Sequence, residues 1–251
     1  MVKKLLRKLE EILPILILLL IWFFVTERED YNSLLFPKLS QVFETAFEKV
    51  KDGSLLLAVG ISLKRVVSGY IIAAILGIGL GIIIGLSEHV YRMTDLLIHI
   101  IKPIPPIAWI PLTILWMGIG EEAKVFLIFL GGFFAILLNT LDGIRYTDKK
   151  LLEVAKVMET PKIKYIFQLI IPAALPSIFT GLRVAMGTCW TCVVAAELVA
   201  SSSGVGYMIS NARNFGQLDV VIVGMISVGI VGKIMDVILK RIEGRVLVWN
   251  S

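Results

Sequence analysis

The chain has 251 residues, of which 57% are hydrophobic and 18% charged, and its mean hydropathy is +0.86. This composition is too apolar for an average soluble domain, and it indicates an integral membrane protein. The net charge of +5 comes from 25 Lys and Arg against 20 Asp and Glu, set in short clusters between apolar runs. Such clusters do not form the basic face that nucleic-acid binding needs, so we expect no nucleic-acid partner.

Six apolar runs approach or reach the roughly 20 residues that a helix needs to cross the hydrocarbon core of a bilayer. The first follows four basic residues, as in a secretory leader, but no small-residue cleavage site comes after it, so we expect an uncleaved span. The pattern predicts an all-α, polytopic membrane protein with about six transmembrane helices, at residues 11–25, 66–86, 96–117, 123–139, 178–200 and 220–239.

The positions of Lys and Arg predict the orientation, because cytoplasmic loops keep an excess of positive charge. With the N-terminus inside, the inner segments hold fourteen Lys and Arg and the outer segments hold six. We therefore expect a multi-pass protein of the cell membrane with both termini in the cytoplasm.

We divide the chain into three parts. Residues 1–33 form the tail and first transmembrane helix, residues 34–62 an outer loop, and residues 63–251 a core with the remaining five transmembrane helices and a cytoplasmic loop at about 142–176. Apolar residues recur at helical spacing in the outer loop, which predicts an amphipathic helix along the outer membrane interface. These residues are Leu39, Val42, Phe43, Ala46, Phe47 and Val50.

Three glycines of the second run, Gly77, Gly81 and Gly85, are spaced four residues apart. This spacing leaves one helix face nearly without side chains, so another helix can approach it closely. A dinucleotide-binding loop is disfavoured because no strand precedes these glycines.

The third run contains four prolines between Pro103 and Pro111, and a regular helix cannot pass through them intact. Broken backbone at membrane depth is tolerated where protein or a water-filled cavity satisfies the freed carbonyl groups. We therefore name Lys102, Pro105, Pro106 and Trp109 as candidate lining of a translocation pathway. A kinked span without solute contact is the alternative.

Two further candidates for the pathway lining are Arg183 and Glu197 in the fifth run. Fourteen residues separate them, about 21 Å along one helix, so each needs a partner on another helix or an aqueous cavity. Lys102 and Arg183 would suit an anionic solute, although structural cations are also expected near the inner ends of the spans. The sequence offers no catalytic or metal-binding constellation, since the histidines and the cysteines lack partners at ligand spacing.

The inner segment at about 142–176 is polar and helical. Thr160 and Pro161 predict the cap and first position of a second short helix, so the segment has a helix-turn-helix shape suited to docking onto a soluble partner. No phosphate-binding loop with Walker spacing occurs in the sequence. If ATP drives transport, another subunit must bind it.

This inner segment resembles the cytoplasmic loop in permease subunits of binding-protein-dependent ABC importers. That loop carries Glu-Ala-Ala, a glycine, then nine residues and Ile-x-Leu-Pro. The matching positions here are Glu153-Val154-Ala155, Glu159, and Leu169-Ile170-Ile171-Pro172. A glutamate at a left-handed turn position costs on the order of 1 kcal/mol, unless Thr160 and Pro161 make a different turn.

Other stretches are similar to the nitrate, sulfonate and taurine branch of these permeases. They are PIPPIAWIPL at 103–112, WMGIGE at 116–121, PAALPSI at 172–178, GLR at 181–183, AEL at 196–198 and GVGY at 204–207. The resemblance implies the type I ABC importer permease fold and transport of a small solute, such as a sulfonate, taurine or nitrate.

The resemblance also implies partners. A cytoplasmic ABC ATPase dimer would bind ATP and Mg²⁺ and dock on a coupling loop, an extracytoplasmic solute-binding protein would deliver the solute, and a second permease copy would complete the pathway. This chain would bind no cofactor and catalyse no reaction. The coupling-loop residues implied are Glu153, Val154, Ala155, Glu159 and Pro172. The alternative function is an ATP-independent secondary transporter or channel, although the two halves of the chain show no internal repeat.

Overall fold

The computed structural model describes the backbone of residues 2–27, 36–147, 153, 155 and 157–247, and the side chains of these residues except 2–12 and 162. The described part of the chain is helical and contains no strand. Its elements are α1 (Val2–Thr26), α2 (Leu39–Lys51), α3 (Ser54–Leu86), α4 (Glu88–Ile101), the 3₁₀-helix η1 (Pro106–Trp109), α5 (Ile110–Met117), α6 (Glu121–Arg145), α8 (Lys162–Tyr165), the π-helical η2 (Ile166–Ile170), α9 (Ile171–Ala200), α10 (Val205–Asn214) and α11 (Leu218–Val246).

Four of the described helices are long and apolar enough to cross a membrane: α3, α6, the continuous helix Ile163–Ala200, and α11. The apolar part of α1, Leu13–Thr26, is shorter. The third run is broken where its prolines predicted a break, and α4 and the pair η1–α5 meet there at an angle of 83°. The prolines between them remove backbone donors and end the first helix.

The helices extend beyond the apolar runs that predicted them. The first long helix, α3, begins directly after Gly53, which has a φ of +77°, and ends at Ser87, whose hydroxyl caps α4 by accepting from the Val90 N–H. Local chain signals of this kind set helix ends. Hydropathy marks only the part of each helix that suits lipid.

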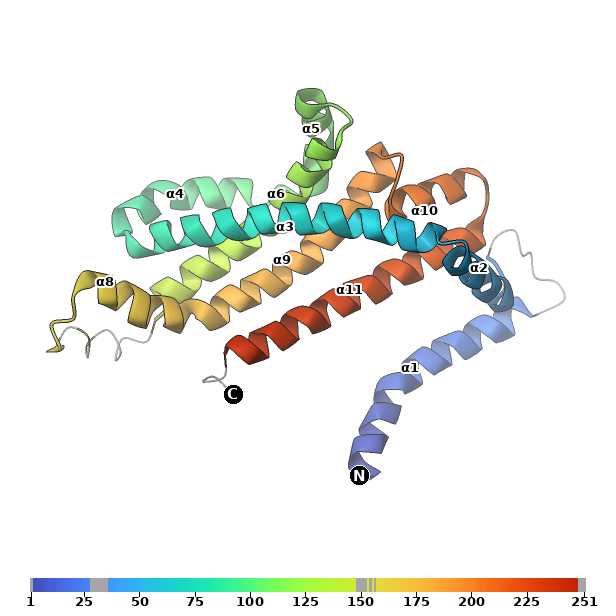
Figure 1. The fold of residues 1–251 in the computed structure, drawn as a ribbon, viewed down its shortest axis with the longest axis horizontal. Coiled ribbons are helices and arrows are strands. Elements are labelled where there is room, and N and C mark those ends of the chain that lie inside the picture. The colour runs from blue at the N-terminus through green and yellow to red at the C-terminus, as the bar shows by residue number, and fades with distance from the viewer. Residues whose placement is uncertain (1, 28–35, 148–152, 154, 156, 248–251) are drawn as a thin grey trace.

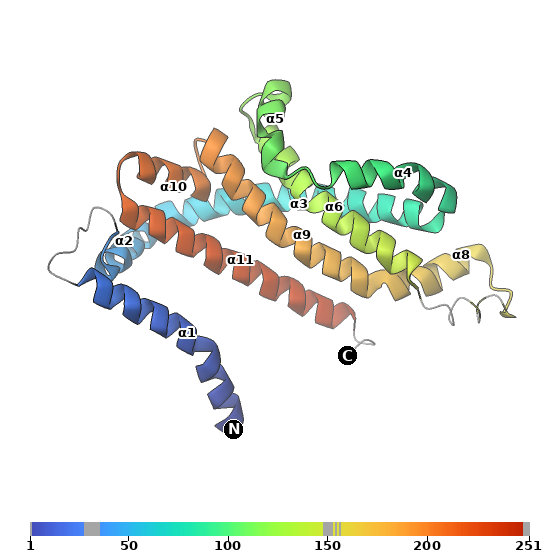
Figure 2. The ribbon, with the colours of Figure 1, turned by 180° about the vertical axis from the view of Figure 1, so that it is seen from behind.

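The long helices form one bundle, in which α6 packs against α3 on one side and α9 on the other (Figures 1 and 2). The last helix, α11, packs against α9, α10 and α2. At one end of the bundle lie α2 and α10, and at the other lies α8; we call these the α10 end and the α8 end. Both α1 and α5 project away from the bundle (Figure 1).

Close approach between α3 and α6 depends on the glycine row. An added Cβ would lie 3.0 Å from Ile136 at Gly77, 2.7 Å from the Thr140 Cβ at Gly81 and 2.9 Å from Ile144 at Gly85. The partner residues on α6 share the same four-residue spacing. The two helices therefore pack backbone to backbone, which any side chain on this face of α3 would prevent.

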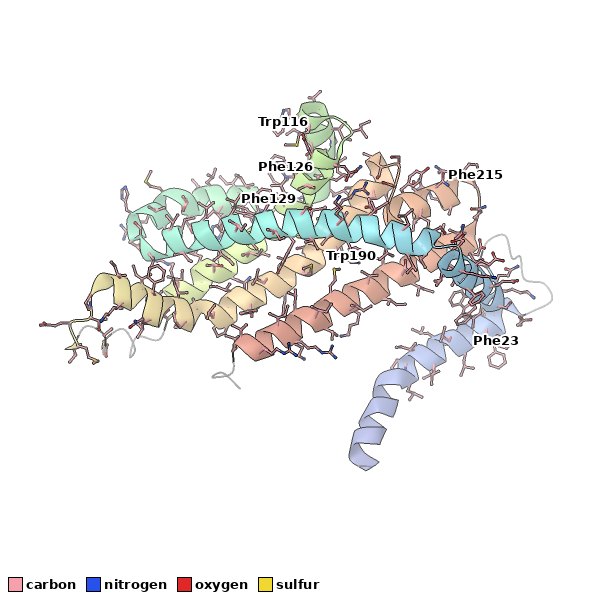
Figure 3. All side chains as sticks on the ribbon, in the orientation of Figure 1. Phe23, Trp116, Phe126, Phe129, Trp190 and Phe215 are labelled. Atoms are coloured by element: carbon pink, nitrogen blue, oxygen red, sulfur yellow. The ribbon has the colours of Figure 1, made fainter. Side chains whose placement is uncertain are left out.

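Packing between α9 and α11 centres on Trp190 (Figure 3). Its indole Nε1 donates to the Val228 carbonyl at 2.9 Å, and its ring lies against Gly232. On another face of α9, Cys189 is fully buried, and a Cβ on Gly132 of α6 would lie 2.6 Å from its sulfur. The cysteine thus serves as a small packing residue.

The amphipathic segment after α1 forms α2, and its apolar residues divide between two environments. Val42 is buried against Leu55 of α3 and Val223 of α11. Phe43 and Phe47 are 63% and 69% exposed. One edge of the apolar stripe thus joins the bundle, and the other faces outward.

Pro161 precedes a helix that runs without interruption into the fifth span, rather than the separate short helix predicted from sequence. Helix α8 begins at Lys162, one residue later than predicted, and continues through η2 into α9. In η2 the Ile171 N–H donates to the Ile166 carbonyl, a π-type bond. Pro172 and Pro176 lack N–H donors, and the wider turn lets the helix pass this region.

Candidate functional site

The proline-rich break opens a hollow between two parts of the chain. Pro105 and Pro106 line a space of about 180 Å³ together with Thr191 and Cys192 of α9. Ile107, Ile110, Leu127 and Ala195 complete the lining. Trp109 lies just beyond this lining and packs against the cluster of Ile110, Leu127 and Ala196. The break therefore places apolar surface and one hydroxyl beside α9.

A larger, polar cavity of about 460 Å³ lies toward the α8 end, and Lys102 is part of its wall. Several charged groups there already have partners. Arg145 pairs with Glu88 at 2.9 Å and lies over the ring of Tyr91. Within the described residues, no carboxylate lies at ion-pair distance from Lys102. The cavity is lined by Tyr91, Asp95, His99, Lys102, Phe134, Ala135, Leu138, Asn139, Leu141, Asp142, Arg145, Tyr146 and Val184.

Arg183 has the partners on another helix that its position in an apolar run requires. Its guanidinium donates to Asp236 at 3.0 Å and to Glu243 at 3.3 Å, both on α11. The side chain is 33% exposed. Two carboxylates thus neutralise the positive charge of Arg183. It therefore attracts an anionic solute less strongly than Lys102 does.

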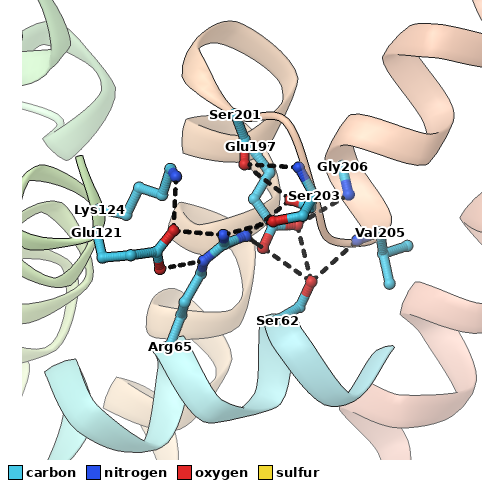
Figure 4. A network of polar contacts seen from close by, with 9 residues as sticks. All are labelled: Ser62, Arg65, Glu121, Lys124, Glu197, Ser201, Ser203, Val205 and Gly206. Carbon is cyan, nitrogen blue, oxygen red and sulfur yellow. Dashed lines mark hydrogen bonds and ion pairs between the residues drawn. The ribbon is translucent and has the colours of Figure 1, made fainter. Parts of the chain in front are cut away.

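Glu197 lies in a closed polar network at the α10 end (Figure 4), and its side chain is fully buried. Its carboxylate accepts from Arg65 at 2.7 Å, from the Ser62 hydroxyl at 2.8 Å and from the Gly206 N–H at 2.9 Å. A Cβ at Gly204, which has a φ of +103°, would collide with this carboxylate. No oxygen of Glu197 is therefore exposed to a solute in this structure.

Arg65 is the centre of the network, and all five of its N–H donors have acceptors (Figure 4). Two go to Glu121 at 2.6 Å, one to Glu197 at 2.7 Å, and two to the backbone and side chain of Ser203 at 2.8 Å. Lys124 pairs with Glu121 at 2.9 Å. Two cations and two carboxylates thus join α3, α6, α9 and the start of α10.

Arg65 was not among the candidate residues named from the sequence. A buried glutamate in an apolar run requires a cation on another helix, and that requirement is a usable signal. The choice of Arg65, with Glu121 and Ser62 beside it, depends on how α3, α6 and α9 pack.

At the α8 end, Glu159 adopts the left-handed conformation, one of the two turns that the sequence left open. Its φ is +48°, the only positive φ of a non-glycine among the described residues. The Thr160 N–H donates to the Ala155 carbonyl at 3.1 Å, a bond typical of a Schellman helix end. Thr160 and Pro161 therefore do not create a different turn, and a glutamate takes the position that glycine usually fills.

The residues around this turn differ in exposure. Glu153 is helical and exposed, and Ala155 is buried, with an exposed fraction of 7%. Pro172 lies half-buried in the first turn of α9. Val154 lies outside the described residues. Four large apolar side chains near the turn are 66–85% exposed: Val157, Met158, Ile163 and Phe167.

The chain is similar in sequence to a family of transport proteins and to several known permeases. Residues 77–248 match the family model described as the binding-protein-dependent transport system inner membrane component. A putative ABC transporter permease of Methanocaldococcus jannaschii is 40% identical, over 88% of this chain and 84% of its own length. A putative aliphatic sulfonates transport permease of Bacillus subtilis is 38% identical, over 94% and 85%. A nitrate import permease of Synechocystis is 33% identical, over 93% and 87%.

A solved structure of the MetNI methionine ABC transporter in an inward-facing conformation is similar in fold. Its TM-score is 0.69 at 17% identity, over 79% of this chain and 98% of that one. This similarity establishes the type I importer permease fold. Together with the family match, it shows that the chain belongs to the family of inner membrane permease components of binding-protein-dependent ABC transporters, in the nitrate, sulfonate and taurine branch.

Proposed function

We propose that this permease forms the translocation pathway of an importer for a small anion such as a sulfonate, taurine or nitrate, and that a separate ATPase dimer drives it. The chain is an ABC importer permease subunit of the membrane and not itself an enzyme. We propose as further partners a solute-binding protein outside the membrane and a second permease copy that completes the pathway. In this arrangement the α8 end and both termini lie in the cytoplasm.

The observation that carries the docking part is the turn at Glu159. Helical residues, among them Glu153, Ala155 and Val157, end there in a left-handed residue, and apolar side chains are exposed around it. Large apolar residues exposed outside the membrane are typical of surfaces that bind another protein. Hydrophobic contact between this turn and an ATPase would let nucleotide-driven movement pull on α9, because α8, η2 and α9 form one continuous helix.

Two cavities support the proposed pathway, and neighbouring residues of one stretch of the chain line them. The polar cavity holds Lys102, and the apolar hollow holds Pro105 and Pro106. Lys102 forms no ion pair with a described residue, so its ammonium group is available to an anionic solute, although Asp95 and Asp142 lie in the same cavity wall. The names of the relatives for sulfonates and nitrate agree with this class.

Docking can be tested by co-purification of the permease with its ATPase. Met158→Asp places a charge in the exposed apolar surface, and Glu153→Arg places a bulky cation beside it. Both should abolish co-purification, because desolvating a charge in an apolar interface is costly. Phe215→Asp is the matched control, since Phe215 and Met158 are each 73% exposed and Phe215 follows α10 at the other end. Retention of the ATPase by Met158→Asp, or its loss with Phe215→Asp, would contradict docking at the α8 end.

A further inference from the structure

The two cavities assigned to the pathway share one wall, the helix α9. Val184 lines the polar cavity, and Thr191 and Cys192 line the apolar hollow. Val184 and Thr191 are seven residues apart, which is two helical turns or about 10 Å, so they lie on nearly the same line along α9. Gly187 lies between them in height, and all three of these residues are exposed. The helix that joins the two cavities therefore carries a glycine between them.

Neither backbone conformation nor packing within the chain explains a glycine at position 187. The residue lies in the interior of α9 with helical backbone, where a glycine lowers stability relative to an alanine. Nothing lies within 4 Å of a Cβ built there. Gly181 of the same helix differs, because its Cβ would lie 2.7 Å from that of Asn139 on α6. The free space beside Gly187 thus belongs to the outside of this chain.

The face of α9 around Gly187 also differs from a face that suits lipid. On α11, Met225 and Ile230 are 60% and 55% exposed, and a bilayer favours large apolar side chains of this kind. On α9, the exposed neighbours of Gly187 are Val184 and Thr191, which are smaller and include a hydroxyl group. Small residues also suit contact with another helix. The cavities at both neighbours favour a water-filled space instead.

We propose that Gly187 sets the width of the pathway where it passes from one cavity to the other, and thereby limits which solutes can cross. It is a specificity-determining residue that acts by leaving space, not by binding the solute. A larger side chain at this position would project into the passage without disturbing the packing of α9 against α6 or α11. The inference rests on the proposed function, because that function assigns both cavities to the pathway.

Access of water to position 187 can be tested with a thiol reporter. The full chain carries Cys189→Ala, Cys192→Ala and Gly187→Cys, is treated in open membrane fragments with a charged, water-soluble thiol reagent, and is then purified. Labelling should be on the order of tenfold or more faster than for Gly229→Cys in the same background, because a charged reagent is excluded from lipid.

Gly229 is the matched control position. It is an exposed glycine inside α11, nothing lies within 4 Å of a Cβ built there, and it lines neither cavity. Labelling of Gly187→Cys no faster than that of Gly229→Cys would overturn the inference, because position 187 would then face lipid or a second copy of the chain.

The width of the passage can be tested by the size of the side chain. Gly187→Leu should lower the maximal rate of uptake about tenfold or more, as expected for a steric overlap, and Gly187→Ala should lower it less. The solutes tested are nitrate, taurine and methanesulfonate. Gly229→Leu should leave the rate unchanged. Thermal unfolding should be similar in Gly187→Leu and Gly229→Leu, which shows that both fold. An unchanged rate in Gly187→Leu, or an equal loss in Gly229→Leu, would overturn the inference.

The labelling needs neither ATPase nor solute, so its outcome is separate from that of the proposed function. ATP-dependent uptake is measured on the parent chain. Fast labelling at position 187 without such uptake would refute the importer and keep Gly187 in a water-filled pathway. Uptake by the parent together with slow labelling would refute only the role of Gly187.

Discussion

The two ends of the bundle differ in whether their charged and apolar side chains find partners within the chain. At the α10 end, the polar groups around Arg65 satisfy one another, and Glu197 is fully enclosed. At the α8 end, helical residues end at Glu159, which has a backbone conformation that glutamate rarely adopts, and apolar side chains are exposed around it. The first arrangement is complete within one chain, whereas the second is the kind of surface that a partner completes.

The largest expected effect comes from Arg65→Ala. It would leave Glu197 buried without its cation, which should lower the free energy of unfolding by about 3–5 kcal/mol. Thermal unfolding of the chain in nanodiscs measures this. Lys64→Ala is the control, because Lys64 precedes Arg65 and has no ion-pair partner in the described structure. An equal loss in both variants would mean that the network does not anchor the α10 end.

A smaller loss of stability is expected from Gly81→Ala, which lies in the contact between α3 and α6. The added Cβ would lie 2.7 Å from Thr140, so α3 and α6 must move apart at a cost of about 1–3 kcal/mol. Gly79→Ala is the matched control, since nothing lies within 4 Å of a Cβ there. Helix propensity alone should make that variant slightly more stable. Similar melting temperatures for the two variants would contradict the close packing.

Glu159→Gly should increase the stability of the helix end. Glycine adopts a positive φ without the steric cost that a glutamate bears, so the end of this helix should gain about 1 kcal/mol. Amide hydrogen exchange at Thr160, whose N–H bonds to Ala155, reports this locally. Glu153→Gly, within the helical segment, should have the opposite sign. Slower exchange in both variants, or in neither, would show that the left-handed turn is not strained.

The smallest effect is expected from Lys102→Gln. Removing this cation from the polar cavity should raise the KM for a sulfonate or nitrate about two- to fivefold, as expected for one exposed charge. Uptake over a range of solute concentrations measures it. Arg92→Gln is the control, because Arg92 is an exposed arginine of α4 that pairs with Glu88 outside the cavity wall. An unchanged KM in Lys102→Gln would remove Lys102 from the pathway.

Hydropathy alone predicted the helical, membrane-spanning class of the protein, and proline chemistry predicted the break after Lys102. Both depend on interactions near in sequence: lipid-length apolar runs, and a residue without a backbone donor. The loop pattern gave the position of the turn at Glu159 but left its geometry open, because Thr160 and Pro161 offered a different turn. The exact helix ends were not predictable, because capping and continuity through η2 depend on hydrogen bonds that hydropathy does not record.

What only the tertiary structure decided is the pairing of distant groups. The sequence requires partners for Glu197 and Arg183, but Arg65 is 132 residues from Glu197, and Asp236 is 53 residues from Arg183. Electrostatic attraction favours any cation near a buried carboxylate. Which cation pairs with which carboxylate therefore depends on which helix faces meet. The glycine row brings α3 against α6, and that packing places Arg65 between Glu121 and Glu197.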